Sequence, residues 1–217
     1  MKKTSGQQHS QYYTASIIIT MCLMMTLLFM DIPVTVSLAQ IYKDLANNNT
    51  FLETFIVTGP FAIGLLWTAV LTGLCQKFSK KKLLIIHCLI GSLAAALSAF
   101  SPNMYIFALC RAVTGFASEP CIALINAIIF ELFQDNSDDS AKILSYTNMF
   151  GCAYSVLLSA LCGKLANLNW RFSQLCNLIP LAGLIFFVHF IPEKPPGQRQ
   201  QKRIPKITTV CRKAAAC

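Results

Sequence analysis

The chain has 217 residues, of which 55% are hydrophobic and only 12% are charged, and its formal net charge is +9 at pH 7. A soluble domain carries about twice that charged fraction, so an ordinary soluble enzyme or binding domain is excluded. Two stretches without a charged residue, Thr54 to Gln76 and Leu83 to Cys110, exceed the roughly 20 apolar residues with which a helix crosses a bilayer. The composition therefore predicts an all-α membrane protein with several spanning helices.

In chain order, the apolar runs predict six spanning helices. They are approximately Ser16–Ile41, Glu53–Gln76, Leu83–Phe100, Met104–Phe133, Ile143–Gly163 and Phe172–Ile191. The first run is longer than the apolar core of a cleavable signal and follows a polar start, so we expect it to remain as a span. The expected organisation is an N-terminal segment (1–14), a six-helix transmembrane domain (15–192) and a basic tail (193–217).

Lysine and arginine are unevenly distributed over the connections. If the N-terminus is cytoplasmic, that side carries fourteen of these residues and the opposite side carries three. Cytoplasmic segments hold the excess of positive charge, so we expect both termini in the cytoplasm and the chain in the plasma membrane (the inner membrane in a bacterium). Topology and attraction to anionic lipid then account for the positive charge, and nucleic acid is not an expected partner.

The side chains known for enzyme and metal chemistry show no recognisable spacing. Eight of the ten cysteines lie in or beside the apolar runs and none forms a C-x-x-C pair, so we interpret them as small hydrophobic residues and expect no metal site. The sequence contains no phosphate loop, H-E-x-x-H motif or nucleophile elbow. We therefore predict neither an enzyme nor a cofactor. The lone His87 and His189 are expected to be buried and hydrogen-bonded.

Three charged residues lie well inside predicted spans, away from the span ends: Asp31 in the first, and Arg111 and Glu119 in the fourth. Charges within a membrane are costly and usually mark a pathway, so these residues are candidates for function. Asp31 and Arg111 fall at similar depths in the outer half and could pair, whereas an unpaired Asp31 could carry a proton. Arg111, Gly115 and Glu119 recur at intervals of four and share one helix stripe. The alternative is that both charges only pair within the bundle.

The fifth predicted helix carries small residues at every fourth position. They are Gly151, Ser155, Ser159 and Gly163. Such a stripe lets another helix approach closely, because packing drives helix association in lipid. The partner helix could belong to this chain or to another one, and the sequence leaves both open.

The loop between the second and third predicted helices, TGLCQKFSKK from Thr72 to Lys81, contains a further motif. With the Arg111–Gly115 pair and the FMDIPVTVSLAQI segment around Asp31, it resembles the major facilitator superfamily of transporters. That family has a Gly-x-Leu-x-Asp-Arg-x-Gly-Arg-Lys loop here. The chain departs from the pattern at Thr72, Gln76 and Ser79. The motif-loop residues that we single out are Gly73, Leu74, Lys77, Lys80 and Lys81.

The resemblance covers about Ala15 to Pro195 and implies the N-terminal six-helix half of such a transporter, built as a 3+3 inverted repeat. It is similar to drug:proton antiporters, which implies multidrug efflux or transport of another small solute. Asp31 would then take up protons, Arg111 would tune that step, and Glu119 would be a second acidic station.

The length raises a separate question, because such transporters have about twelve helices with substrate held between two halves. Three explanations are compatible with the sequence: a homodimer of halves, a partner chain that supplies the other half, or a truncated reading frame. A different class is also possible. The chain could be a non-transporting membrane protein that associates with another chain through its fifth helix.

Overall fold

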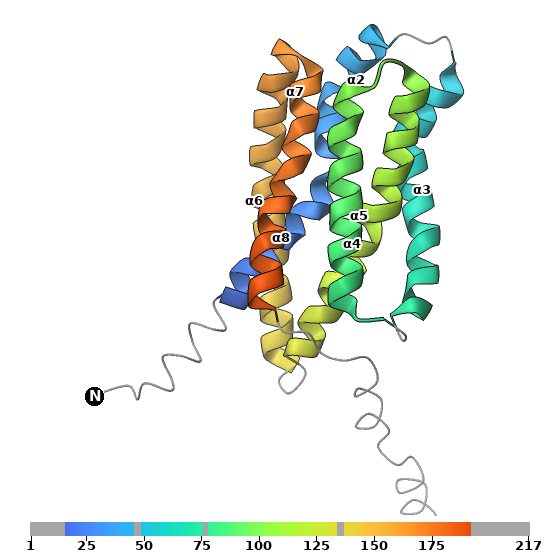
Figure 1. The fold of residues 1–217 in the computed structure, drawn as a ribbon. Helices are drawn as coiled ribbons and strands as arrows, with labels where there is room; N and C mark the ends of the chain where they lie inside the picture. The colour runs from blue at the N-terminus through green and yellow to red at the C-terminus, as the bar shows by residue number, and fades with distance from the viewer. Residues whose placement is uncertain (1–15, 46–48, 76–77, 134–136, 192–217) are drawn as a thin grey trace, which may run out of the picture.

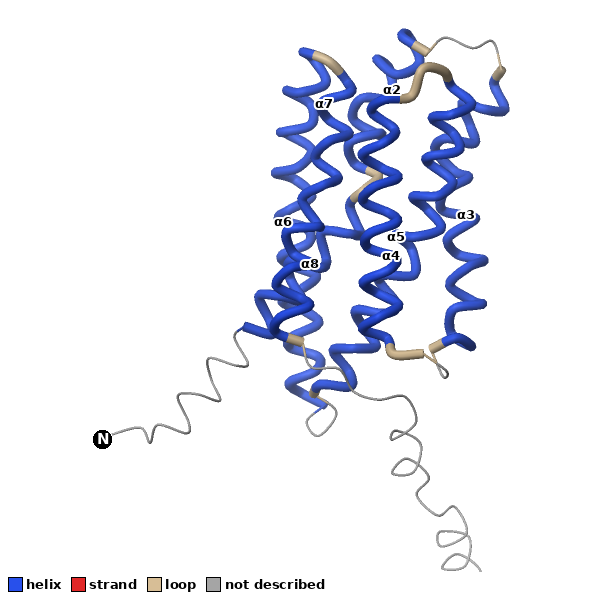
Figure 2. Tube along the Cα trace, viewed as in Figure 1, coloured by secondary structure: helices blue, strands red, loops and turns tan. Residues whose placement is uncertain are grey.

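The computed structural model describes residues 16–45, 49–75, 78–133 and 137–191, and these residues form helices and short connections without a strand (Figure 2). Six helical segments are long and apolar enough to cross a membrane: Ser16–Asp44, Thr50–Leu74, Lys80–Phe100, Met104–Leu132, Ser140–Leu168 and Trp170–Phe190. The prediction of six spans is confirmed. The largest difference is in the fifth span, which continues five residues beyond the predicted Gly163. The predicted terminal segments and Lys77 lie outside the described residues.

Three of the six spans contain a 3₁₀ stretch. The first is helical over 16–24, continues as the 3₁₀ helix η1 (Met25–Phe29), turns at 30–31 and resumes as α2 (Ile32–Asp44). Figure 2 shows this interruption as a tan segment within the span. The third span is α4 (Lys80–Leu97) with η2 (Ser98–Phe100), and the sixth is α7 (Trp170–Leu175), η3 (Cys176–Leu178) and α8 (Ile179–Phe190). The remaining spans are the continuous helices α3 (Thr50–Leu74), α5 (Met104–Leu132) and α6 (Ser137–Leu168).

Asparagine side chains start the three helices that follow the connections at one end of the bundle. Asn49 accepts a hydrogen bond from the Phe51 amide at 3.1 Å, Asn103 from Ile106 at 2.9 Å and Asn169 from Arg171 at 2.9 Å. An asparagine at this position satisfies a backbone donor that has no partner within the helix. These caps fix where α3, α5 and α7 begin.

The spans pack in a reciprocal pattern between the first three and the last three. The first packs on the fifth through α2 and α6, and the fourth packs on the second through α5 and α3. Likewise α4 packs on α5, and α7 packs on α2. Exchanging the two triplets of spans reproduces these contacts, as a 3+3 repeat requires. In Figure 1 the start of the first span and the end of α8 lie at the same end of the bundle.

The buried apolar side chains form two clusters, one toward each end of the bundle. One contains the first-span residues Ile17 to Met30 and the fourth-span residues Cys121 to Ile129, and the other contains Val34, Ile41, Met104 and Phe107. Asp31, Arg111 and Glu119 fall in sequence between the parts of their spans that belong to these clusters. The charged residues therefore occupy a middle layer with apolar packing on either side.

Candidate functional site

Arg111 and Asp31 form an ion pair that joins the fourth span to the first. The distance from Arg111 Nη2 to Asp31 Oδ1 is 2.6 Å, and the arginine side chain is only 3% exposed, against 43% for the aspartate. Asp31 lies at the interruption of the first span, as the residue that directly precedes α2. The predicted proximity of these two charges is therefore present. The pair leaves Asp31 partly open while Arg111 is enclosed.

A proline in α3 supplies the second contact of Arg111. Pro60 lies inside α3 and has no backbone N–H, so the carbonyl of Ile56, four residues earlier, loses its helical donor. Arg111 Nε donates to that Ile56 oxygen at 3.4 Å. A transmembrane helix tolerates proline where a neighbouring helix satisfies the freed carbonyl, and here Arg111 does so. The arginine thus connects three spans.

Gly115 and Glu119 place the rest of the stripe against α3. A Cβ atom on Gly115 would overlap the backbone of Pro60, and one on Gly64 would overlap the side chain of Glu119 and the carbonyl of Gly115. The two helices therefore cross with their backbones in contact. Glu119 is half-buried, with its aliphatic part on Gly64, and it interacts electrostatically with Asp31. The role predicted for Gly115, helix packing, agrees with this crossing.

The three charged side chains have a definite charge balance. The carboxylates of Asp31 and Glu119 and the guanidinium of Arg111 sum to one negative charge when all are ionised. Arg111 pairs with Asp31, as the 2.6 Å distance shows, while Glu119 lies about 12 Å along the helix from Arg111 at 1.5 Å per residue. One carboxylate in excess, within a membrane span, is suited to binding a proton or a cation.

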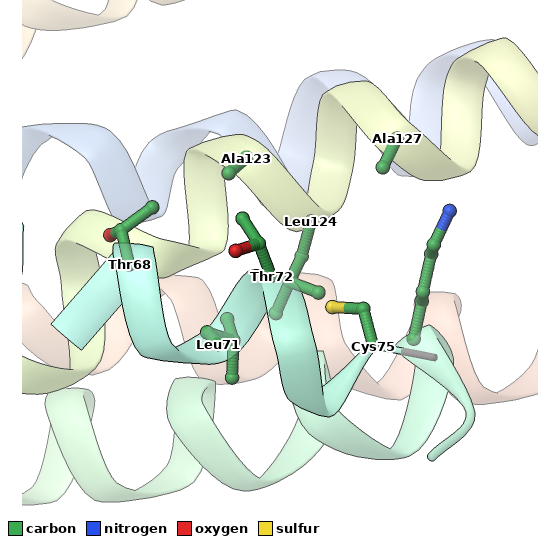
Figure 3. A pocket seen from close by; sticks show the side chains of 8 residues that line it. Thr68, Leu71, Thr72, Cys75, Ala123, Leu124 and Ala127 are labelled. Atoms are coloured by element: carbon green, nitrogen blue, oxygen red, sulfur yellow. The ribbon is translucent and has the colours of Figure 1, made fainter. Parts of the chain in front are cut away.

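A cavity of about 210 Å³ opens between α3 and α5, one helical turn beyond Glu119. Figure 3 shows its walls: α3 contributes Thr68, Leu71, Thr72 and Cys75, and α5 contributes Ala123, Leu124 and Ala127. Lys80 completes the lining. The hydroxyls of Thr68 and Thr72 donate to carbonyls of their own helix at 2.8 and 2.6 Å. The cavity is mainly apolar, and its volume is below the roughly 300–1,000 Å³ of a typical small-molecule pocket.

The predicted motif loop connects helix ends on the side of the bundle where α4 begins. Lys80 Nζ forms an ion pair with Glu131 Oε1 near the end of α5, at 2.7 Å. Lys81 Nζ donates to the carbonyls of Val188, at 2.9 Å, and Ile191 at the end of α8. Cations next to the first turn of a helix are unfavourable unless other groups compensate them, and these partners provide that compensation. The lysines hold α4 against α5 and α8.

The other two residues of the motif loop behave differently. A Cβ on Gly73 would meet no atom within 4 Å, so this glycine is not required by packing. Leu74 is partly buried against the apolar cluster that includes Leu84. The loop pattern thus combines two anchoring lysines, one packing leucine and one unconstrained glycine.

The small-residue stripe of the fifth span packs within the chain. A Cβ on Gly151 would lie 3.0 Å from the Phe29 ring, and one on Gly163 would lie 3.6 Å from Val36. Ser155 and Ser159 are half-buried, and their hydroxyls donate to carbonyls of α6 at 2.7 and 2.8 Å. Gly151 and Gly163 therefore pack on the first span of the same chain, and contact of the stripe with another chain stays a prediction.

Sequence reasoning missed two polar links between spans. Trp67 Nε1 on α3 donates to His87 Nε2 on α4 at 2.9 Å, and Phe116 of α5 stacks on the same indole with ring centroids 4.5 Å apart. Trp170 Nε1 on α7 donates to Asp44 Oδ2, at the end of α2, at 2.7 Å. The prediction that His189 is buried is wrong, because its side chain is exposed, whereas His87 is buried and hydrogen-bonded, as predicted. Its partner could not be found from spacing because the two residues belong to different helices.

A buried hydroxyl and amide network was also missed. Gln174 Nε2 donates to Ser37 Oγ at 3.1 Å, and Ser173 Oγ lies 3.3 Å from Ser37 Oγ. All three side chains are fully buried. In a membrane such groups must find partners inside the protein, so the network joins α2 to α7. Within the part of the chain that the structure describes, no cluster of three or more histidine, cysteine or acidic residues could hold a metal ion.

Comparison with known proteins agrees with this architecture. A family model described as Major Facilitator Superfamily matches residues 14–216. Among solved structures, the crystal structure of a mutant of the nucleoside transporter NupG is similar, with a TM-score of 0.72 at 16% sequence identity. The match covers 89% of this chain and 48% of that one, so the chain spans about half the length of the structure it resembles. No match was found among curated proteins.

Proposed function

The chain belongs to the major facilitator superfamily, and we propose that it moves a small solute across a membrane in a proton-coupled manner, as one six-helix half of a transporter. The observation that carries this proposal is the Asp31–Arg111 pair, with an N–O distance of 2.6 Å, in a layer between two apolar clusters. A buried ion pair contributes little to stability compared with apolar packing. Its presence there fits a functional requirement better than a structural one.

Asp31 is the proton-binding residue in this proposal. Its side chain is 43% exposed while Arg111 is enclosed at 3%, and the proposal requires that water reaches the exposed part of Asp31. Protonation of Asp31 would break the ion pair and leave Arg111 with the Ile56 carbonyl as a partner. Proton binding is thereby coupled to the contact between the first and fourth spans.

The substrate class follows from the charge of the site. Asp31 and Glu119 outnumber Arg111 by one negative charge, which favours a cationic, drug-like solute exchanged against protons. The related solved structure is that of a nucleoside transporter, so uncharged nucleosides are the second class to test. A mainly apolar wall beside Glu119 suits the hydrophobic body of a drug-like cation better than a sugar.

A second six-helix unit completes the pathway in this proposal, either as another copy of the chain or as a partner chain. Within the most apolar 18-residue stretch of each span, only 28% is buried in the second and 22% in the fifth, against 44–56% in the others. These two spans occupy equivalent positions in the two repeats. The cavity of about 210 Å³ is small for a drug-sized solute, and a second unit would enlarge it.

The expected setting is the plasma membrane, with both termini in the cytoplasm. The excess of lysine and arginine in the connections on that side supports this orientation. Attachment of a membrane-impermeant thiol reagent to a cysteine introduced at position 2 tests it. Labelling should occur only after the membrane is opened, and labelling of intact cells would reverse the orientation.

Transport by proteoliposomes tests the proposed function. We would follow uptake of a fluorescent lipophilic cation and of a labelled nucleoside under an imposed pH gradient. Asp31→Asn should abolish proton-driven exchange, and Glu119→Gln should reduce it about tenfold. Glu53→Gln is the matched control, because it makes the same chemical change at the start of α3, outside the stripe. Equal proton-driven transport in the wild type and Asp31→Asn would remove Asp31 from the mechanism.

The second candidate function, a non-transporting chain that binds another membrane protein through α6, is favoured by the low burial of the fifth span. The exposed face of α6 includes Val156 (69%) and Leu157 (71%). If it is correct, Leu157→Asn should disrupt a detergent-stable complex while the chain transports nothing at any pH. Bulky replacements of Ser155 and Ser159 should instead disturb the packing within the chain.

A further inference from the structure

The row of α5 residues that begins with Arg111 continues beyond Glu119. At the same interval of four follow Ala123, Ala127 and Glu131, and rows at this interval are the ridges by which helices pack. Glu119 and Glu131 are twelve residues apart in the sequence, or about 18 Å along the helix axis. Between its two acids the row therefore carries only the small side chains of alanine.

The helix α3 carries the matching row. Its members are Pro60, Gly64, Thr68 and Thr72. A Cβ atom on Gly64 would overlap the side chain of Glu119, so the two helices touch at this level. Four residues later on each helix, Thr68 and Ala123 line the cavity of about 210 Å³, together with Thr72 (Figure 3). The cavity is therefore the space that opens between the two rows as the helices leave their crossing.

The two ends of this cavity differ in charge. At the crossing end, the aliphatic part of Glu119 lies against Gly64, one helical turn before Thr68. At the far end, Lys80 lines the cavity and its ammonium contacts Glu131 at 2.7 Å, while Glu131 itself is outside the lining. A space with a carboxylate at one end and an ammonium at the other favours a ligand whose positive charge points to Glu119.

The walls between these ends are mainly apolar. The hydroxyls of Thr68 and Thr72 donate to the carbonyls of Gly64 and Ala69, at 2.8 and 2.6 Å, so both hydroxyls already have partners. An apolar cavity of about 150 Å³ binds benzene. A volume of about 210 Å³ therefore accommodates one aromatic ring with a short substituent.

We propose that the cavity between α3 and α5 is the subsite for a ring-sized apolar group of a cationic solute, and that Ala123 and Ala127 set its size limit. This inference rests on the proposed function, because it assigns a place to one part of the transported solute. Ala123 follows Glu119 by four residues, about 6 Å along the helix, so an ammonium attached to the bound ring lies within the attraction of that carboxylate. A longer side chain at either alanine would occupy the space of the ring.

Calorimetric titration with two ammonium ions of the same charge tests the subsite. The full chain in lipid nanodiscs is titrated at one pH with benzyltrimethylammonium and with tetramethylammonium, and empty nanodiscs give the signal of the lipid alone. We expect the benzyl compound to bind about tenfold more tightly or better, because only this ion has a ring to bury. Equal affinities of the two ions, or no binding of the benzyl compound, would overturn the inference.

Filling the cavity should remove this preference for the benzyl compound. Ala123→Leu and Ala127→Leu should each lower the ratio of the two affinities about tenfold, while tetramethylammonium binds as before. Ala69→Leu is the matched control, because it makes the same change at an exposed position of α3 outside the lining, and it should keep the ratio. Misfolded chain lowers binding of both ions alike, so the ratio reports on the cavity even in a less stable variant. An unchanged ratio in both filling variants would overturn the inference.

Replacement of the carboxylate separates the charge from the cavity. Glu119→Gln should weaken binding of both ions by a similar factor and keep their ratio, because it removes the charge and leaves the space. Unchanged binding of both ions in this variant would contradict the assigned orientation. Proton-driven uptake that depends on Asp31, combined with an unchanged ratio in the filling variants, would reject this inference alone. Uptake that does not depend on Asp31 would reject the proposed function instead.

Discussion

The first and fourth spans are built on the same plan but differ in backbone. Ser16–Asp44 and Met104–Leu132 each have 29 residues. Asp31 and Glu119 both lie fifteen residues after the start of their span, and Pro33 or Pro120 follows within two positions. The fourth span is a continuous helix, whereas the first is interrupted at its carboxylate. The same position in two repeats thus carries an acid in two different settings.

The difference determines what each carboxylate can do. Asp31, at the interruption, pairs with Arg111 while 43% of its side chain is exposed. Glu119 remains on a regular helix with its aliphatic part packed on Gly64. An interrupted helix therefore gives an accessible, paired acid, and a continuous one gives a packed acid. Arg111 has no counterpart in the first span, where Leu23 holds the equivalent position, so the single arginine serves both repeats.

Removal of the arginine that serves both repeats is expected to have the largest effect on stability, and it tests the comparison of the two spans most directly. We expect Arg111→Ala to lower the free energy of unfolding by about 3 kcal/mol, because it leaves Asp31 and the Ile56 carbonyl without a donor inside the bundle. Thermal unfolding in detergent measures the loss. The double variant with Asp31→Asn should recover part of it. If the double variant is no more stable than the single one, the ion pair is not the cause.

The next largest effect on stability is expected where the fourth span crosses the second. Gly115→Val should destabilise the chain by about 2 kcal/mol, because its side chain would overlap the Pro60 backbone and push α3 from α5. Gly73→Ala is the matched control in a helix without neighbours at that point, and it should be neutral or stabilising by up to about 1 kcal/mol. Chemical unfolding curves for both variants provide the measurement, and equal losses would contradict the assigned crossing.

Trp67 lies in the first triplet of spans and Trp170 in the second, and replacing each with phenylalanine compares their hydrogen bonds. Trp170→Phe removes a hydrogen bond to the charged Asp44 carboxylate, and we expect a loss of about 2 kcal/mol. Trp67→Phe removes a hydrogen bond to a neutral histidine and should cost about 1 kcal/mol. Thermal unfolding monitored by circular dichroism ranks the two. The reverse order would show that ring packing around Phe116 outweighs the charge on Asp44.

The smallest expected effect concerns the stripe on α6. Gly151→Ala places its methyl group 3.0 Å from the Phe29 ring, whereas Gly163→Ala places it 3.6 Å from Val36. The first should cost about 0.5 kcal/mol through the displaced ring, and the second should gain about the same amount from helix propensity. The free energy of unfolding of both variants, measured in the same detergent, tests this difference. A gain at Gly151 together with a loss at Gly163 would contradict these contacts and place the contact of the stripe on another chain.

The sequence predicts this fold well because its main signals are local. Uncharged runs define the six spans, and the cost of a charge in lipid identifies Asp31, Arg111 and Glu119 before any contact is known. The similar depth of Asp31 and Arg111 follows from counting residues along two helices. These arguments need only the rise of a helix and the thickness of a membrane.

What sequence reasoning missed depends on helix rotation and backbone breaks. The interruption before α2 is not implied by Pro33, since Pro120 is accommodated within a continuous helix. The Ile56 carbonyl becomes a partner of Arg111 only because Pro60 of α3 faces α5. Trp67 and His87, or Gln174 and Ser37, meet only after the spans have taken their relative orientations. A single sequence contains no direct signal for such pairings.

The reciprocal packing has a consequence for how the chain enters the membrane. Asp31 precedes its partner Arg111 by 80 residues, which is roughly 4–16 s of synthesis at about 5–20 residues per second. The first span also has to wait for α6 before Phe29 meets Gly151. Neither triplet of helices can therefore complete its contacts alone after insertion. Until the fourth span arrives, Asp31 lacks its arginine partner, and a proton can neutralise the carboxylate in its place.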